Sequence, residues 1–288
     1  MQDTEIPLVV DVDGSLLKSD LLLETLWAAL GNHFFLTLWA VLTSIWTPAK
    51  LKRALYNLAD LDITLQPVNP EVLALCREAK LDKLRVVLAS GSDQNLITAL
   101  GLHLGIGGKH YGSDGQTNLT GRRKAAELVD KFGEYGFDYI GNAAPDLKIW
   151  KIAHSIIAVA PSANLRRKID KTGRAAKIIG KPWNPTSLIK GMRPYQWVKN
   201  GLLLVPVLAA HSMEVSVWLQ VLVGIVSFNA GASAIYIVND LLDLEADRLH
   251  PRKKNRPFAS GSVPIWAAMG SSVGLTFVAF FAGAFIGW

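Results

Sequence analysis

Two aspartates one residue apart, Asp11 and Asp13, follow the first apolar run of the chain, in the sequence Asp-Val-Asp-Gly-Ser. Side chains alternate along an extended strand, so residues 11 and 13 point to the same side. Of two such carboxylates, one can attack a phosphorus atom while the other transfers protons, provided that a cation screens their repulsion. The pattern predicts a phosphoryl-transfer site.

Three later segments supply complementary groups. Ser90 ends a second apolar run, in Ala-Ser-Gly-Ser, where its hydroxyl and the backbone around Gly91 can hold phosphate oxygens. Lys124 begins a helical pattern and offers a fixed positive charge for a developing phosphoryl oxygen. Asn142 and Asp146 follow a third apolar run and offer the hard oxygen ligands that Mg²⁺ prefers.

The elements that must position these residues alternate between two periodicities. Short apolar runs predict strands at Pro7–Val12, Leu84–Ala89, Phe137–Ile140 and Ile156–Val159. Helical patterns separate them at Asp20–Leu30, Pro70–Asp82, Gln94–Leu100 and Lys124–Phe132. Alternating strands and helices predict an α/β domain with a parallel sheet, whose sites lie at the carboxyl ends of the strands.

In this order the residues resemble the four motifs of the haloacid dehalogenase (HAD) superfamily of phosphatases, over residues 7 to about 160. The resemblance implies Asp11 as nucleophile and Asp13 as general acid and base, with Ser90 and Lys124 on the phosphate. It also implies Mg²⁺ ligands and further substrate contacts: Asp11, Asp13, Asn142 and Asp146 for the ion, Ser15 and Gly91 for the substrate. Asn142 replaces the more usual Asp, which is expected to weaken metal affinity without removing it.

Residues from about 18 to 68 are expected to form the small helical cap that such enzymes insert to exclude water and select substrate. Thr25–Ala49 contains no Lys, Arg, Asp or Glu and is long enough to cross a bilayer, but Gly-Asn-His at 31–33 interrupts it. We expect a cap that packs on the sheet and rests on the membrane surface, with a true span as the alternative. Lys52 and Arg53 are interpreted as a solvated helix face, with contact to substrate in a closed cap as the alternative.

The second half of the chain has a different composition. Half of the 288 residues are hydrophobic and the net charge is +6, but both features are local. Arg166–Lys199 contains ten Lys or Arg and one acid, and we interpret 166–185 as a basic linker after a HAD-like domain at 1–165. This balance indicates a cytoplasmic face against anionic lipid rather than a nucleic-acid site, for which no module is present in the sequence.

Three uncharged stretches predict an all-α transmembrane segment of about three helices over 186–288. They are a helix running from Thr186 into Asn200–Met213, then Val215–Val238, then Val263–Trp288. The loop between the first two carries only His211 and Glu214, whereas the other flanks are rich in Lys and Arg. The chain is therefore expected to be an integral membrane protein with the HAD-like domain on the cytoplasmic side.

An acidic ladder follows the second stretch. On a helix, four oxygen-bearing side chains would share one face: Asn239, Asp240, Asp243 and Asp247. Such a face can hold Mg²⁺, and five basic residues behind it could neutralise phosphates: Arg248, Arg252, Lys253, Lys254 and Arg256. The alternative is a solvated helix end followed by a positive-inside loop.

With Asn-Arg-Pro at 255–257, the ladder resembles the UbiA-type intramembrane prenyltransferase family, over residues 186–288. The sequence Arg193–Asn200 is most similar to the branch that transfers phosphoribose to a polyprenyl phosphate. The resemblance implies that the ladder holds Mg²⁺ and a diphosphate and that three basic residues contact phosphate oxygens: Arg193, Lys199 and Arg256. For Arg193 and Lys199 the alternative is interfacial snorkelling.

Joined, the two resemblances predict consecutive steps in a bacterial inner membrane. The membrane part would make a polyprenyl-phosphoryl-5-phosphoribose and the soluble part would remove the 5-phosphate. The expected partners are a polyprenyl phosphate or diphosphate lipid, a phosphorylated small molecule and membrane lipid, without nucleic acid. Alternatives are an aromatic-acceptor prenyltransferase, and a membrane-tethered phosphatase or non-catalytic scaffold. UbiA-type proteins have more helices and a second acidic motif, so we expect either that this chain is the first part of a longer one or that its transferase half is incomplete.

Overall fold

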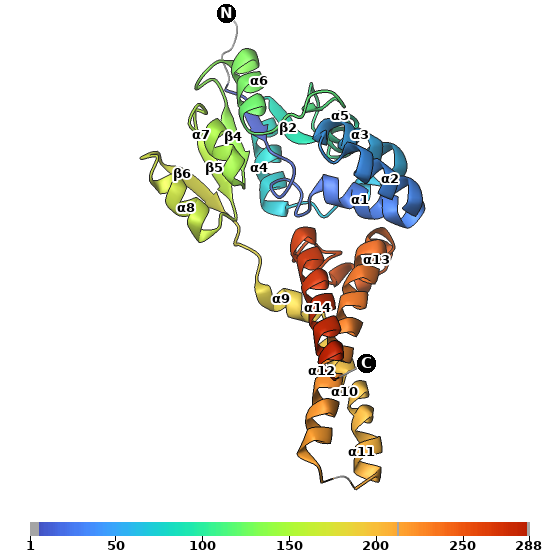
Figure 1. Cartoon of the computed structure of the whole chain (residues 1–288). Helices are drawn as coiled ribbons and strands as arrows, with labels where there is room; N and C mark the ends of the chain where they lie inside the picture. The colour runs from blue at the N-terminus through green and yellow to red at the C-terminus, as the bar shows by residue number, and fades with distance from the viewer. Residues whose placement is uncertain (1–5, 212, 287–288) are drawn as a thin grey trace, which may run out of the picture. The chain divides into compact units, whose positions relative to one another are not determined.

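The computed structural model describes residues 6–211 and 213–286. The chain divides into two compact units, Met1–Trp183 and Asn184–Trp288. The first is an α/β unit and the second is built of helices (Figure 1). The boundary lies close to the end of the predicted linker.

The α/β unit is organised around a six-stranded sheet. Its strands are β1 Leu8–Val10, β2 Val86–Asp93, β3 Tyr111–Ser113, β4 Asp138–Gly141, β5 Ile156–Val159 and β6 Ala176–Ile179. Their order is β3-β2-β1-β4-β5-β6, and every neighbouring pair is parallel. β1 is central, with Leu8 opposite Val86 on one side and Asp138 on the other. The predicted parallel α/β sheet is confirmed.

Alternation along the central strands divides the core into two layers. Val10 and Leu88 pack with α4 Pro70–Leu81 and α5 Gln94–His103 on one face. Val9 and Val87 pack on the other face with α6 Arg122–Phe132, α7 Leu147–Trp150 and α8 Ala163–Asp170. Because both faces are covered, the residues of these strands that pack in the two layers are apolar.

The linker prediction for 166–185 is wrong over most of its length. Arg166–Asp170 completes α8, and β6 pairs with β5 from Ile156↔Ala176 to Val159↔Ile179. β6 is an edge strand with an exposed Lys177, so it lacks the apolar run of the central strands. Only the residues from Gly180 to Asn184 connect β6 to the next helix.

The cap follows the β1 loop as predicted. It comprises α1 Leu21–Asn32, α2 Phe34–Ser44, α3 Pro48–Ala59 and the short 3-10 helix η1 Ile63–Leu65 (Figure 1). Asp20 caps α1 by accepting hydrogen bonds from the backbone N–H groups of Leu22 and Leu23. The alternative that Thr25–Ala49 crosses a bilayer is wrong, because breaks at His33 and Thr47 leave α2 with 11 residues.

The helical unit contains two helices long and apolar enough to cross a membrane, α12 Val215–Leu242 and α14 Ile265–Ile286. They pack through small residues: the Ser227 hydroxyl donates to Ala279 O at 2.7 Å, and Gly231 lies beside Ala279. Shorter elements complete the unit: α9 Pro185–Gly191, η3 Pro194–Gln196, α10 Trp197–Asn200, η4 Gly201–Leu204, α11 Val205–Ala209, α13 Leu244–Leu249 and η5 Lys253–Asn255.

Of the three apolar spans predicted for this half, the second and third are confirmed as long apolar helices, and the first is not a single helix. The first expected span is a succession of short helical segments in which η4 and Pro206 interrupt the α-helical hydrogen bonding. The second is longer than predicted, because α12 continues through Asn239 and Asp240 to Leu242. The third ends at Ile286, and the last two residues of the predicted stretch, Gly287 and Trp288, lie outside the described residues.

Candidate active sites

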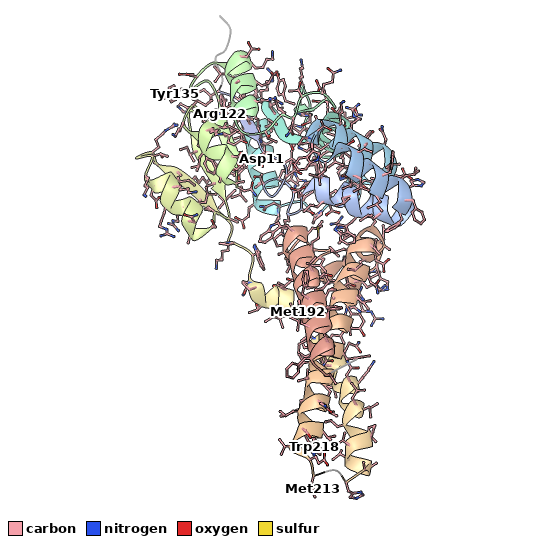
Figure 2. All side chains as sticks on the ribbon, viewed as in Figure 1. Asp11, Arg122, Tyr135, Met192, Met213 and Trp218 are labelled. Carbon is pink, nitrogen blue, oxygen red and sulfur yellow. The ribbon has the colours of Figure 1, made fainter. Side chains whose placement is uncertain are left out.

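The first site lies at the carboxyl end of β1, inside the α/β unit, where Figure 2 labels Asp11. The chain turns sharply there at Gly14, which has φ +74°. A Cβ at this position would lie 2.1 Å from Asn142 Nδ2, so only glycine lets the two loops approach. The Ser15 hydroxyl donates a hydrogen bond to Asp11 Oδ2 at 3.1 Å and so helps to fix the orientation of the carboxylate.

Lys124, on α6, makes the central ion pair. Its Nζ lies 2.6 Å from Asp11 Oδ1 and also donates to Ala89 O and to the Tyr139 hydroxyl. Asp146 Oδ1 lies 3.9 Å from the same Nζ. All the charged groups of this cluster are buried, so the ammonium offsets carboxylate charge that would be costly alone.

Asp13 is held by a separate set of donors. Its Oδ1 accepts from the Leu21 N–H at 2.8 Å. Its Oδ2 accepts from the hydroxyls of Ser90 and Ser92, at 2.6 and 2.8 Å. Ser90, which the motif analysis assigned to substrate phosphate, therefore orients Asp13, and Ser92 is a partner that the motif analysis missed.

The loop after β4 is ordered by Asp146. Its Oδ2 accepts from the N–H groups of Asn142 and Ala143 at 3.1 and 2.9 Å, and its Oδ1 accepts from the Tyr139 hydroxyl at 2.9 Å. Gly141 lies so close that a Cβ there would be 2.7 Å from Asp146 Oδ2. The structure thus brings Asn142 and Asp146 to the edge where Asp11 lies.

The pKa of Asp11 is raised to about 7, because burial and the nearby carboxylates of Asp146 and Asp13 together outweigh the lowering effect of Lys124. Three carboxylates around one ammonium leave an excess of negative charge. Within residues 6–211 and 213–286 no three His, Cys, Asp or Glu side chains converge as a ready metal site. Mg²⁺ is usually bound by one or two carboxylates together with phosphate oxygens and water, so the oxygen donors and the excess charge fit this ion.

The cap reaches the site through Lys52 on α3. Its Nζ donates to Gly91 O at 2.6 Å and to Asn118 Oδ1 at 2.8 Å, and burial lowers its pKa while Asp13 and Asp20 raise it. Arg53 Nε lies 2.6 Å from Asp93 Oδ2. The interpretation of this pair as a solvated face is wrong. The Gly91 carbonyl accepts the hydrogen bond from the cap, and Thr120 packs where a Cβ of Gly91 would lie, so the site leaves no space for a side chain at this position.

The second site lies in the helical unit, where two buried carboxylates share Arg256. Its Nη1 lies 3.0 Å from Asp240 Oδ1 and 2.7 Å from Asp247 Oδ2. Arg193 Nη2 adds a 2.5 Å contact to Asp240 Oδ1, and its guanidinium stacks 5.0 Å from the Tyr236 ring centroid. Lys253 Nζ lies 3.5 Å from Asp247 Oδ1.

The other members of the ladder lie apart from this cluster. Asn239 and Asp243 are exposed, whereas Asp240 and Asp247 are buried. The prediction that all four share one face is therefore wrong: the helix ends at Leu242, and the ladder divides into a buried and an exposed pair. Lys199 is exposed on α10 and does not join the cluster in the described part of the chain.

Polar contacts that the motifs did not reveal attach the segment before α11 to α12. Trp197 Nε1 donates to the Ser233 hydroxyl at 3.0 Å, and that hydroxyl donates to Met192 O at 3.0 Å. Asn200 Nδ2 donates to Asn229 Oδ1 at 2.6 Å. Single polar residues within the apolar pattern of α12 were the available signal, since such residues usually face a neighbouring helix. Met192, labelled in Figure 2, belongs to this junction.

The sheet order, the cap after β1 and the carboxylates at the strand ends define the first unit as a HAD-like α/β fold. In the second unit, residues 202–288 match the model of the UbiA prenyltransferase family.

Three relatives illustrate the match. An uncharacterized protein of Sinorhizobium fredii, y4nM, is 33% identical over 270 residues, which are 91% of this chain and 51% of that protein. The decaprenyl-phosphate phosphoribosyltransferase of Corynebacterium glutamicum is 47% identical over 91 residues, 31% of this chain and 27% of that enzyme. Its Mycolicibacterium smegmatis counterpart is 47% identical over 106 residues, 35% and 33% of the two chains. The chain spans about half of these relatives' length, or less.

Two solved structures are similar to the chain. A phosphoserine phosphatase with a phospho-aspartyl intermediate analogue covers 62% of this chain and 95% of its own, at 16% identity and a TM-score of 0.42. A substrate-bound phosphoserine phosphatase complex covers 65% and 98%, at 15% identity and a TM-score of 0.42. The assignment of the fold rests on the sheet, the cap and the site described above.

Proposed function

We propose that the α/β unit is a Mg²⁺-dependent phosphatase in which Asp11 is the nucleophile. The observation that carries this is the buried Asp11–Lys124 pair at the end of the central strand, 2.6 Å apart. The Asp11 carboxylate would attack the phosphorus of a phosphate monoester while Asp13 gives a proton to the leaving alcohol oxygen. Water would then cleave the aspartyl phosphate as Asp13 takes its proton, returning Asp11 and inorganic phosphate.

Each neighbouring group has a defined part in this proposal. Lys124 would stabilise negative charge on the phosphoryl oxygens and hold Asp11 in place. Ser90 and Ser92 would keep Asp13 oriented, since both hydroxyls donate to it. Bound Mg²⁺ would screen the carboxylates from the incoming phosphate, with Asp11, Asp13, Asn142 and Asp146 as the groups that hold it or its water.

For the helical unit we propose transfer of a prenyl-linked or sugar phosphate group, with phosphoribosyl transfer to a polyprenyl phosphate as the specific reaction. The similarity to the two decaprenyl-phosphate phosphoribosyltransferases supports this acceptor, and the match of residues 202–288 to the UbiA family model supports the class. Asp240 and Asp247 would bind Mg²⁺, and Arg193 and Arg256 would bind phosphate. An aromatic acceptor is the alternative that these residues alone do not separate.

The joint proposal is that the phosphatase acts on the product of such a transferase. Inorganic phosphate released from polyprenyl-phosphoryl-5-phosphoribose would be measured with the intact chain and with Asp11→Asn. Release by the intact chain and its loss in the variant would support the proposal. Equal release from both chains would refute it, and hydrolysis of small esters without hydrolysis of this lipid would keep the phosphatase but refute the substrate.

A further inference from the structure

The cap helix α2 exposes its large apolar side chains and buries small ones, the opposite of what is usual for a helix on the surface of a water-soluble domain. Thr37 and Ala40 face inward, and the Thr37 hydroxyl donates to Ala29 O and His33 O at 2.8 and 2.9 Å. Facing outward are eight large apolar residues, 45–89% exposed, here called the α2 face: Phe34, Phe35, Leu36, Leu38, Trp39, Leu42, Ile45 and Trp46. A surface helix normally shows the reverse arrangement.

The eight residues of the α2 face lie outside the buried cluster of the cap, which α2 contacts through Val41 instead. The buried cluster of the cap, Ala29, Leu55 and Ala59, belongs to α1 and α3. Elsewhere on the α/β unit, large exposed apolar residues such as Leu81 and Leu102 stand singly. Eight of them within 13 residues form a continuous apolar surface, which marks a place of interaction.

We propose that the α2 face inserts into the lipid–water interface of the membrane in which the helical unit lies. Its composition fits that location, because Trp and Phe side chains favour the headgroup boundary and an interfacial helix buries one apolar face there. Thr25–Ala49 contains no charged residue that would have to enter lipid. The first charge after it, the exposed Lys50, suits anionic headgroups.

The covalent connection between the α/β unit and the helical unit favours lipid, rather than a partner protein or a second copy, as what covers the α2 face. The α/β unit is joined by residues 180–184 to a unit with two helices that can cross a membrane. Five extended residues reach about 17 Å. A bilayer is therefore always near this unit, whereas a partner protein or a second copy would have to be recruited. Because the helical unit already anchors the chain to the membrane, even a weak contact between the α2 face and lipid becomes effective.

This contact would also narrow the substrate class, a consequence that rests on the proposed phosphatase function. α2 follows α1, whose first N–H, at Leu21, donates to Asp13 Oδ1 at 2.8 Å. Docking of α2 would hold the cap, and with it the Asp11 site, at the membrane surface. The substrate would then be a phosphate monoester carried on a lipid.

The test uses the full chain in lipid nanodiscs containing phosphatidylglycerol, with a nitroxide spin label on single cysteines. Phe35→Cys and Leu42→Cys lie two turns apart on the α2 face, and Leu102→Cys on α5 is the matched control, with 75% exposure against 65% for Leu42. The native Cys76 is buried, and burial raises its pKa to about 12, so it stays unlabelled while the unit is folded. Collision with oxygen, which concentrates in lipid, is compared with collision with a water-soluble nickel chelate.

We expect the labels at 35 and 42 to lose nickel collisions and gain oxygen collisions relative to the label at 102. Equal values at all three positions would overturn the proposal. Dipolar broadening between labels at position 35 would assign the face to a second copy and would overturn it as well. Protection of Cys76 confirms folding in each variant. Since the readout is spectroscopic, failure of the phosphatase proposal would leave this result unaffected, and the reverse also holds.

Discussion

The two candidate sites neutralise the charge of their buried carboxylates in different ways. At Asp11 the charges come from distant segments, and Lys124 lies 113 positions along the chain from its partner. At Asp240 the partners are two arginines, Arg193 and Arg256, that close directly on the acids. In the proposed mechanism, the first arrangement holds the Asp11 nucleophile beside a fixed cation. In the second, a phosphate ligand would have to displace the arginines from the acids before these could hold a metal ion.

The largest expected effect of a single change is on the folding of the first site. Lys124→Met leaves Asp11 and Asp146 buried without their ammonium, which should cost about 3–5 kcal/mol of unfolding free energy. Urea denaturation of the micelle-solubilised chain, followed by the reactivity of Cys76, measures this. Lys131→Met, at an exposed pair on the same helix, should leave the unfolding free energy nearly unchanged. Equal effects of the two variants would show that the buried pair does not organise the site.

The next largest effect concerns proton transfer. Asp13→Asn should lower the kcat for phosphate release by about 10²–10⁴, because the amide cannot exchange a proton with the leaving oxygen or with water. Asp114→Asn, in an exposed turn, is the control and should leave kcat unchanged. A decrease in kcat of less than threefold for Asp13→Asn would remove this residue from the proton-transfer role.

The second site should show coupling among its own charges. A double-mutant cycle with Asp247→Asn and Arg256→Gln is expected to give an interaction energy of about 1–3 kcal/mol, since the two side chains are in direct contact. Detergent-induced unfolding of the helical unit, followed by circular dichroism, provides the values. Asp243→Asn, at an exposed position, should show no coupling with Arg256→Gln. Coupling of equal size between Asp243 and Arg256 would support the prediction from the sequence that the four ladder residues share one helix face.

The smallest effect is expected at the cap. Lys52→Met removes hydrogen bonds to Gly91 O and Asn118 Oδ1, which should weaken cap closure by about 1.5 kcal/mol and raise KM roughly tenfold. The kcat should change little, because Lys52 holds the cap rather than the phosphoryl group in this account. Steady-state kinetics with a small phosphate ester measures KM and kcat separately, and a decrease confined to kcat would contradict the account.

Much of the α/β unit could be predicted because its central strands and motif residues are local signals. Asp11, Asp13 and Asp146 each follow a strand, so the topology of a parallel sheet brings them together. The edge strands were missed because β3 has three residues and β6 contains a lysine. The contacts of Ser92, Tyr139 and Lys52 depend on packing between distant segments, which no periodicity shows.

The acidic ladder was harder to predict for a different reason. Helical spacing places Asn239, Asp240, Asp243 and Asp247 near one another, but it does not say which of them a second segment covers. Arg256 returns from beyond α13 to contact two of the four, and Arg193 approaches from before α12. The burial of Asp240 and Asp247 thus follows from where these loops lie, and the sequence contains only the charges.

The central claim, that Asp11 is the nucleophile, can be tested by trapping its phosphorylated form. The full chain would be mixed with Mg²⁺ and a phosphate ester, quenched in acid and treated with borohydride, which reduces an aspartyl phosphate to homoserine. Mass spectrometry of the peptide around residue 11 should show homoserine at Asp11 and at no other aspartate, and none in Asp11→Asn. Phosphate release without modification at residue 11, or unchanged release by Asp11→Asn, would contradict the account.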